Sequence, residues 1–99
     1  MADLQVVGVM TAKPGSEKVV EQALNALVEP TRSEAGCTSY ELFASAVDKA
    51  TFITVETWTS QDALDAHMQT PHVQQALSTA ADHLAQTPAI HPLTALSAG

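Results

Sequence analysis

The stretch LQVVGVMTAKPG, residues 4–15, decides the fold, because it is strand-like but has no polar face. Its first nine positions are rich in β-branched residues, and a Lys-Pro-Gly turn signal follows at residues 13–15. Alternate side chains of a strand point to opposite faces. Apolar side chains stand on both faces here, with Val6 and Met10 on one and Val7 and Val9 on the other. A sheet built on this strand needs a cover on each side.

A helix is expected next, because apolar residues recur at helical spacing from Val19 to Val28. Ser16 is placed to cap its start, and Pro30 is expected to kink the helix or end its regular part. Residues 37–44 and 51–58 are both strand-like, and the short connection between them predicts a hairpin.

The second half predicts two further helices and one strand. Ser60 is placed to cap a short helix that contains Leu64, and Thr70 with Pro71 restarts a second one. Pro88 is expected to stop that second helix. Residues 89–97 then form a last strand, which Pro92 assigns to the edge of the sheet.

The order β-α-β-β-α-β predicts a single α+β domain, residues 1–99, with a ferredoxin-like antiparallel sheet. Helices cover one face of such a sheet, and the chain has no spare element for the other apolar face. We therefore expect a second copy of the chain to cover it, giving a homodimer.

The composition excludes several classes of partner. Lys+Arg number 4 against 11 Asp+Glu, so the formal net charge is −7 and phosphate backbones are repelled. No apolar run is long enough to span a bilayer, which argues against a membrane partner. The single Cys37 and an N-terminus without the basic residues of a signal peptide predict a cytoplasmic protein.

Several short motifs occur in an order that is familiar. Residues 34–41 (EAGCTSYE) lead into the second strand, residues 55–58 (VETW) end the third, and residues 60–67 (SQDALDAH) and 70–72 (TPH) follow. With the strand and turn of residues 4–15, this pattern resembles the antibiotic biosynthesis monooxygenase (ABM) family over nearly the whole chain. The resemblance implies a dimeric α+β barrel with a pocket between the sheet and its own helices. For quinol monooxygenases of this family, it also implies oxidation of aromatic quinols by O2 without metal or flavin.

Not every residue of the family's active branches is present. The antibiotic-tailoring branch uses an asparagine and a tyrosine where Thr54 and Leu64 stand in this sequence. The haem-degrading branch uses an asparagine and an iron-ligating histidine where Val7 and Leu77 stand. Haem degradation is therefore disfavoured, and the tailoring set is incomplete. Trp58 matches the family's strand-end tryptophan, which lines the pocket.

Two histidines are the candidate catalytic residues. His67 shares a helix face with Ala63 and Leu64, so it should point inward, where an imidazole can deprotonate a phenol or quinol. The alternative for His67 is a neutral imidazole bonded to a backbone carbonyl. His72 lies in the first turn of the next helix and is either a cavity-wall residue that assists by hydrogen bonding or a partly exposed helix start.

The candidate substrate-binding residues are Trp58, Tyr40 and Glu56. Trp58 offers a flat wall for an aromatic ring and an N–H donor, or is simply a core aromatic. Tyr40 and Glu56 could each hydrogen-bond a ligand hydroxyl, although Glu56 could equally face solvent or bridge a dimer. His67 and His72 straddle a helix break and reproduce no metal-binding spacing, so no metal is expected. No phosphate loop or dinucleotide fingerprint is present, so no cofactor is expected either.

The sequence thus favours a homodimeric, cofactor-independent monooxygenase that acts on a small quinol-like or polycyclic aromatic substrate with O2. Two alternatives stay open. One is a non-catalytic homodimer of the same fold that binds a small apolar or aromatic ligand. The other is a cofactor-free isomerase or decarboxylase that uses the same base without O2.

Overall fold

The computed structural model describes residues 3–97, and the other residues of the predicted 1–99 domain lie outside this described part. The elements follow one another as β1 (Leu4–Thr11), α1 (Glu17–Arg32), β2 (Cys37–Ala44), β3 (Thr51–Trp58), α2 (Gln61–Met68), α3 (Pro71–Ala80), the 3₁₀ turn η1 (Ala81–His83) and β4 (Ala89–Pro92). Within residues 3–97, no helix is both long and apolar enough to cross a membrane.

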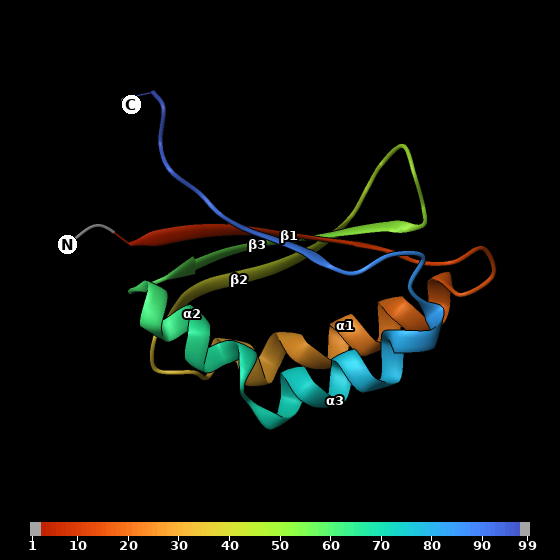
Figure 1. Cartoon of the computed structure of the whole chain (residues 1–99), viewed down its shortest axis with the longest axis horizontal. Helices are drawn as coiled ribbons and strands as arrows, with labels where there is room; N and C mark the ends of the chain where they lie inside the picture. The colour runs from red at the N-terminus through yellow and green to blue at the C-terminus, as the bar shows by residue number, and fades with distance from the viewer. Residues whose placement is uncertain (1–2, 98–99) are drawn as a thin grey trace.

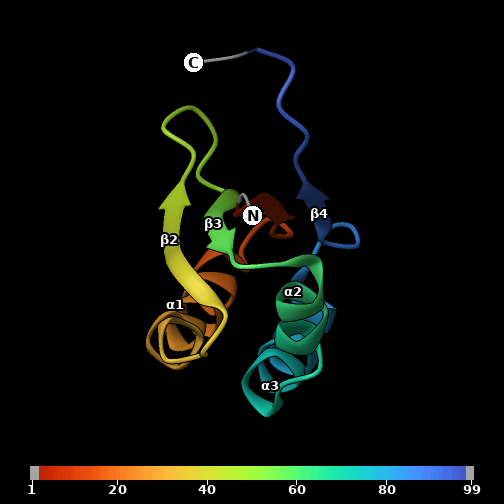
Figure 2. The same cartoon turned by 90° about the vertical axis from the view of Figure 1, so that its left-hand side faces the viewer.

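The strands form one antiparallel sheet in the order β2-β3-β1-β4. All these helices lie on one side of the sheet (Figures 1 and 2). Helices α1 and α3 lie side by side beneath it, and α2 lies near the start of β2 and the end of β3. The central position of β1, between β3 and β4, follows from its two apolar faces. The predicted α+β ferredoxin-like fold is confirmed.

The core lies between the sheet and the helices. Every second side chain of β1 and β3 faces the helices, so Val6, Met10 and Phe52 are buried. On the helix side, Val20, Leu24 and Leu27 of α1 and Val73 and Ala76 of α3 complete the packing. The sides of α1 and α3 that face the sheet are therefore apolar.

Helix α1 lacks the cap predicted at its start and continues past Pro30 at its end. Ser16 makes no side-chain cap, and its hydroxyl is instead hydrogen-bonded to Nδ1 of His83 at 3.0 Å. Pro30 does not end the helix, which continues to Arg32. Because Pro30 stands in the last turn, its missing N–H removes only one helical hydrogen bond. Nε of Arg32 donates to the carbonyl oxygen of Tyr40 at 2.9 Å and ties this turn to β2.

The end of the chain also departs from the prediction. Helix α3 ends at Ala80 rather than at Pro88, because the chain turns to pair with the end of β1: Leu84 bridges Ala12, and the N–H of Ala85 donates to Thr11 at 2.8 Å. Strand β4 covers only Ala89–Pro92 instead of residues 89–97. Pro92 has no N–H to donate, and the edge position expected from it is confirmed by the sheet order.

Within residues 3–97, no helix packs on the other face of the sheet. Val7, Val9 and Ile53 are on this face, and Phe43 and Val55 are about half exposed on it, at 48% and 43%. This apolar surface, which we call the open face, is the one for which the sequence predicts a second copy of the chain as cover.

Candidate active site

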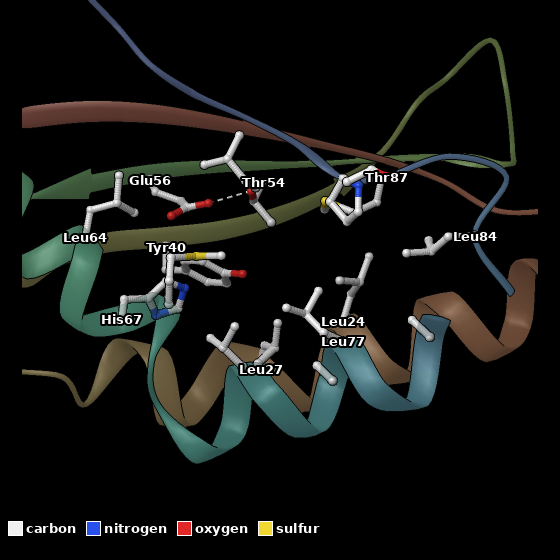
Figure 3. Close-up of a pocket in the computed structure, with 17 residues that line it drawn as sticks. Leu24, Leu27, Tyr40, Thr54, Glu56, Leu64, His67, Leu77, Leu84 and Thr87 are labelled. Atoms are coloured by element: carbon white, nitrogen blue, oxygen red, sulfur yellow. Dashed lines mark hydrogen bonds between the residues drawn. The ribbon is translucent and has the colours of Figure 1, made fainter. Parts of the chain in front are cut away.

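A cavity of about 210 Å³ lies between the helix-facing side of the sheet and the three α-helices (Figure 3). Most of its lining side chains are apolar, among them Met10, Leu24, Leu27, Leu64, Leu77 and Ile90. The polar side chains in the lining are Tyr40, Thr54, Glu56, His67 and Thr87. Figure 3 shows Tyr40, Glu56 and His67 together at the end near α2, with Leu84 and Thr87 at the opposite end. The cavity therefore has one polar end and a long apolar remainder.

His67 reaches the cavity because α2 is held at both ends. The Ser60 hydroxyl accepts the N–H of Ala63 at 3.1 Å and fixes the start of the helix. At the other end, the Thr70 hydroxyl donates to the carbonyl of His67 at 2.7 Å and accepts the N–H of Val73 at 3.3 Å. One threonine thus ends α2 and caps α3. The predicted inward orientation of His67 is confirmed, since its side chain is only 5% exposed.

Glu34 connects the two candidate catalytic histidines. Its Oε2 lies 2.7 Å from Nδ1 of His67 and 2.8 Å from Nε2 of His72. A carboxylate can only accept, so each imidazole nitrogen donates its N–H to the same oxygen. This pairing puts the proton of a neutral His67 on Nδ1 and leaves Nε2 with a lone pair. Among residues 3–97, no hydrogen bond is formed to that Nε2.

The loop that carries Glu34 packs closely against α2. Its backbone is fixed by hydrogen bonds from Glu34 N–H to the Thr31 carbonyl at 3.0 Å and from Cys37 N–H to the Glu34 carbonyl at 3.1 Å. A Cβ at Gly36 would collide with Cβ of Ala63. The absence of a side chain at Gly36 therefore lets α2 approach the loop closely enough for Glu34 to reach His67.

A second carboxylate, that of Glu56, lies at the polar end of the cavity and is 4% exposed. Its Oε2 accepts the Thr54 hydroxyl at 2.6 Å, and its Oε1 accepts Nε1–H of Trp58 at 2.9 Å. These three side chains share the helix-facing side of β3 because they are two residues apart. Gly8 stands opposite Thr54 in β1, where a Cβ would lie 2.5 Å from the Thr54 hydroxyl oxygen. Within the described chain, no cation pairs with Glu56.

Tyr40 and Trp58 surround the His67 ring in different ways. The Tyr40 ring centroid is 5.9 Å from that of His67, and Tyr40 lines the cavity. Burial, and secondly the negative charge of Glu56, raise the pKa of Tyr40 well above its ordinary value, so its phenol stays protonated. The Trp58 ring centroid is 4.6 Å from that of His67, but Trp58 is fully buried behind the cavity wall.

The structure thus brings all five predicted site residues into one group, of which three line the cavity. Tyr40, Glu56 and His67 line the cavity, while Trp58 contacts both Glu56 and His67 from behind. His72 lies outside the cavity, with its side chain 24% exposed, and joins the group through Glu34. The sequence interpretation assigned no role to Glu34, although this residue opens the family-like stretch at residues 34–41.

The positions that depart from the family's active branches are also clear. Thr54, Leu64 and Leu77 all line the cavity, whereas Val7 belongs to the open face. Leu77 supplies no imidazole to the cavity, and iron ligation at that position is chemically impossible for a leucine.

Comparison with known proteins identifies the family. The model of the family described as antibiotic biosynthesis monooxygenase matches residues 4–79. The chain belongs to this family. The resemblance noted in the sequence is therefore confirmed, and the matched residues include Glu34, His67 and His72 together with Tyr40, Glu56 and Trp58.

Curated relatives from three organisms match by sequence, and two of them show the extent of the match. Protein sll1783 of Synechocystis sp. is 32% identical over 81 residues, which cover 82% of this chain and 55% of that protein. Rv0793 of Mycobacterium tuberculosis, whose name describes it as a putative monooxygenase, is 36% identical over 67 residues, 68% of this chain and 65% of its own. The chain thus spans less than two thirds of these relatives' length.

Solved structures of the family share the whole architecture. PA3566 from Pseudomonas aeruginosa superposes with a TM-score of 0.89 and 33% identity, over 98% of this chain and 97% of that chain. The structure of Rv0793 gives a TM-score of 0.87 and 29% identity over 98% of each chain.

Proposed function

We propose that this ABM-family protein is a cofactor-independent monooxygenase that oxidises a quinol-like aromatic molecule with O2. One observation carries the proposal: His67 lies at the polar end of a largely apolar cavity while its Nδ1 is hydrogen-bonded to Glu34 at 2.7 Å. An imidazole held in this way has a lone pair on Nε2 and an adjacent carboxylate that stabilises the imidazolium formed when it takes a proton. In general base catalysis, a carboxylate paired with a histidine holds the imidazole in the required tautomer and orientation in the same way.

In this mechanism His67 removes the proton of one substrate hydroxyl. The resulting anion is electron-rich enough to reduce O2, which an undissociated quinol does slowly. His72 does not contact the substrate but donates to the same oxygen of Glu34, at 2.8 Å, and keeps that carboxylate in place. His67 is the catalytic residue, and Glu34 and His72 are positioning residues.

The polar end of the cavity suits a molecule with two hydroxyl groups. While one hydroxyl gives its proton to His67, the other donates to the Glu56 carboxylate, which otherwise faces the cavity without a cationic partner. The protonated phenol of Tyr40 donates to the developing oxyanion. Trp58 acts by holding Glu56 and packing on His67 rather than by stacking on the substrate.

The reaction balances without a cofactor. O2 forms one bond to a ring carbon of the quinol anion, the O–O bond breaks, and the second oxygen atom leaves as water. The four electrons needed come from the substrate, which becomes a hydroxyquinone. The whole cavity, about 210 Å³, exceeds an apolar cavity of about 150 Å³ that binds benzene, which supports a fused two-ring compound as the substrate.

The proposal includes a homodimer formed through the open face and, consistent with one unpaired cysteine, a location in the cytoplasm. Phe43 and Val55 are large apolar side chains left about half exposed by a single chain. Pairing with a second copy removes this surface from water and puts a second layer over the sheet, away from the cavity. In a two-fold dimer the same patch of both copies forms the interface, so the open face of one copy covers that of the other.

Oxygen uptake tests the proposed reaction. Chelator-treated protein is mixed with a reduced naphthoquinone in metal-free buffer, and O2 consumption is compared with the autoxidation rate. We expect faster uptake and one ¹⁸O atom from ¹⁸O₂ in the hydroxyquinone product. Ligand-dependent thermal stabilisation with no uptake would select the non-catalytic binding protein instead. Conversion of a substrate without O2 would select the isomerase or decarboxylase.

A further inference from the structure

Glu34, His67 and His72 come from three different segments, the loop before β2, helix α2 and helix α3, yet they converge on one point. One ligand atom of each lies within 4.8 Å of the other two. The set of two imidazole nitrogens and one carboxylate oxygen is the donor set of His₂Glu zinc sites, which keep a fourth position open for water or another ligand. Local spacing does not reveal this set, because Glu34 is 33 residues before His67.

The present spacing is that of hydrogen bonds, but it is close to that of a metal site. Zinc binds nitrogen and oxygen at about 2.0–2.1 Å, so ligand atoms in a tetrahedral site lie roughly 3.3 Å apart. The distances from Glu34 Oε2 to the two imidazole nitrogens are 2.7 and 2.8 Å. Opening each by about half an ångström makes room for the ion, provided that the two imidazole nitrogens, which lie within 4.8 Å of each other, also come to about 3.3 Å. Rotation of the three side chains supplies both changes.

Exposure and charge also favour a cation. The side chains of Glu34 and His72 are 16% and 24% exposed, so an ion can enter from solvent, while His67 at 5% closes the inner side. The N-terminal end of α3 opposes a positive charge near His72. The Glu34 carboxylate in direct contact outweighs it, and the formal net charge of −7 raises the local cation concentration.

We propose that Glu34, His67 and His72 bind a divalent first-row transition metal ion, with Zn²⁺ as the best match to this donor set. The ligand atoms are Oε2 of Glu34, Nδ1 of His67 and Nε2 of His72, and water completes the coordination. His67 is then the inner ligand, with its other ring nitrogen directed away from the ion.

Metal binding changes Nε2 of His67 from a hydrogen-bond acceptor to a donor. Coordination through Nδ1 requires the ring proton of a neutral imidazole to move to Nε2. Toward the cavity, Nε2 then donates a hydrogen bond instead of accepting a proton. This consequence rests on the proposed function: metal-loaded protein loses the base and is an inactive form of the enzyme. The binding site itself does not depend on that function.

Binding of Co²⁺ to resting, tag-free, chelator-treated protein tests the site without any turnover. We expect the visible absorption of tetrahedral Co²⁺ at one equivalent per chain, displaced by Zn²⁺. His72→Ala removes a partly exposed ligand and should weaken Zn²⁺ binding by at least about 10- to 100-fold, as loss of a ligand costs at least as much as loss of an outer-shell partner. The matched control His91→Ala removes an exposed histidine of β4, outside the cluster, and should leave binding unchanged.

Two results would overturn the metal site. One is failure of wild-type protein to bind Co²⁺ or Zn²⁺ more tightly than His72→Ala. The other is unchanged binding in Glu34→Gln, which keeps both imidazoles and removes the carboxylate. Thermal melting of wild-type protein with and without Zn²⁺ gives a second readout that needs no variant. Oxygen uptake by metal-free protein is measured separately, so failure of the metal site and failure of the monooxygenase are distinguishable.

Discussion

Replacement of Glu34 by glutamine isolates the contribution of its negative charge. Glu34 contacts His67 and His72 through one oxygen, and glutamine has nearly the same shape, with an amide oxygen that can still accept these two N–H groups. The orientation of His67 is therefore largely kept. What is lost is the carboxylate that stabilises the imidazolium formed when His67 takes the substrate proton.

The size of this effect follows from the strength of the bond that is weakened. A hydrogen bond to a charged group contributes about 1.5–3 kcal/mol, against about 1 kcal/mol for a neutral one. The Glu34 side chain is 16% exposed, so solvent screens little of this difference. A loss of about 0.5–2 kcal/mol in the transition state lowers kcat by roughly 2- to 30-fold, with KM changed much less.

The assay is O2 uptake with a reduced naphthoquinone in metal-free buffer, with kcat and KM measured separately. Glu29→Gln is the matched control, because it makes the same chemical change at a carboxylate whose side chain is 88% exposed at the end of α1. Its kcat should equal that of the wild type. A folded Glu34→Gln variant with wild-type kcat would refute the argument that Glu34 stabilises the charged form of His67.

Three further outcomes follow from the same structure. Trp58→Phe leaves Oε1 of Glu56 without its donor, which should destabilise the fold by about 1–3 kcal/mol and lower Tm by roughly 4–8 °C per kcal/mol in a thermal melt; an unchanged Tm would contradict the buried hydrogen bond. Val55→Lys puts a charge on the open face, opposite Val7 in the register, and should reduce the light-scattering mass from that of a dimer to 10.4 kDa; a wild-type protein that is already monomeric would exclude the interface. Burial raises the pKa of Tyr40 above its ordinary value of 10.0, so as pH rises this tyrosine ionises in the unfolded chain before it ionises in the folded one. The stability contributed by the protonated phenol is therefore complete below pH 10.0 and falls as pH rises above it. Absorbance of this single tyrosine should show tyrosinate only on alkaline unfolding, and ionisation at the ordinary pKa in folded protein would contradict its burial.

The sequence was sufficient for the elements whose signals are local. The hairpin strands β2 and β3 have the bounds Cys37–Ala44 and Thr51–Trp58, as predicted, because each is a short strand-like segment and the loop between them is short enough for a hairpin. The caps at Ser60 and Thr70 were predicted as well. The end of α3 was not predicted, because the helical periodicity of the sequence continues to Leu84. In the structure, Leu84 instead pairs with Ala12, just after β1. This contact joins residues far apart in the chain, so a local pattern does not reveal it.

The candidate site shows the same division. The inward direction of His67 follows from helical spacing within α2, so it was predictable. The Glu34 contacts to His67 and His72 span 33 and 38 residues, and nothing in the local pattern of the loop indicates where its side chain will point. Trp58 was expected to line the pocket, but the indole N–H has a buried acceptor two residues away in Glu56. This pair places the ring behind the cavity wall.

The central claim is that His67 removes a proton from a quinol bound in the cavity, and the O2-uptake rate of His67→Ala tests it most directly. The variant is compared with wild-type protein in metal-free buffer, after circular dichroism has shown that both are folded. We predict a fall of about 100- to 10,000-fold, toward the autoxidation rate, with partial recovery when imidazole is added to fill the space left by the side chain. A wild-type rate in folded His67→Ala would contradict the claim.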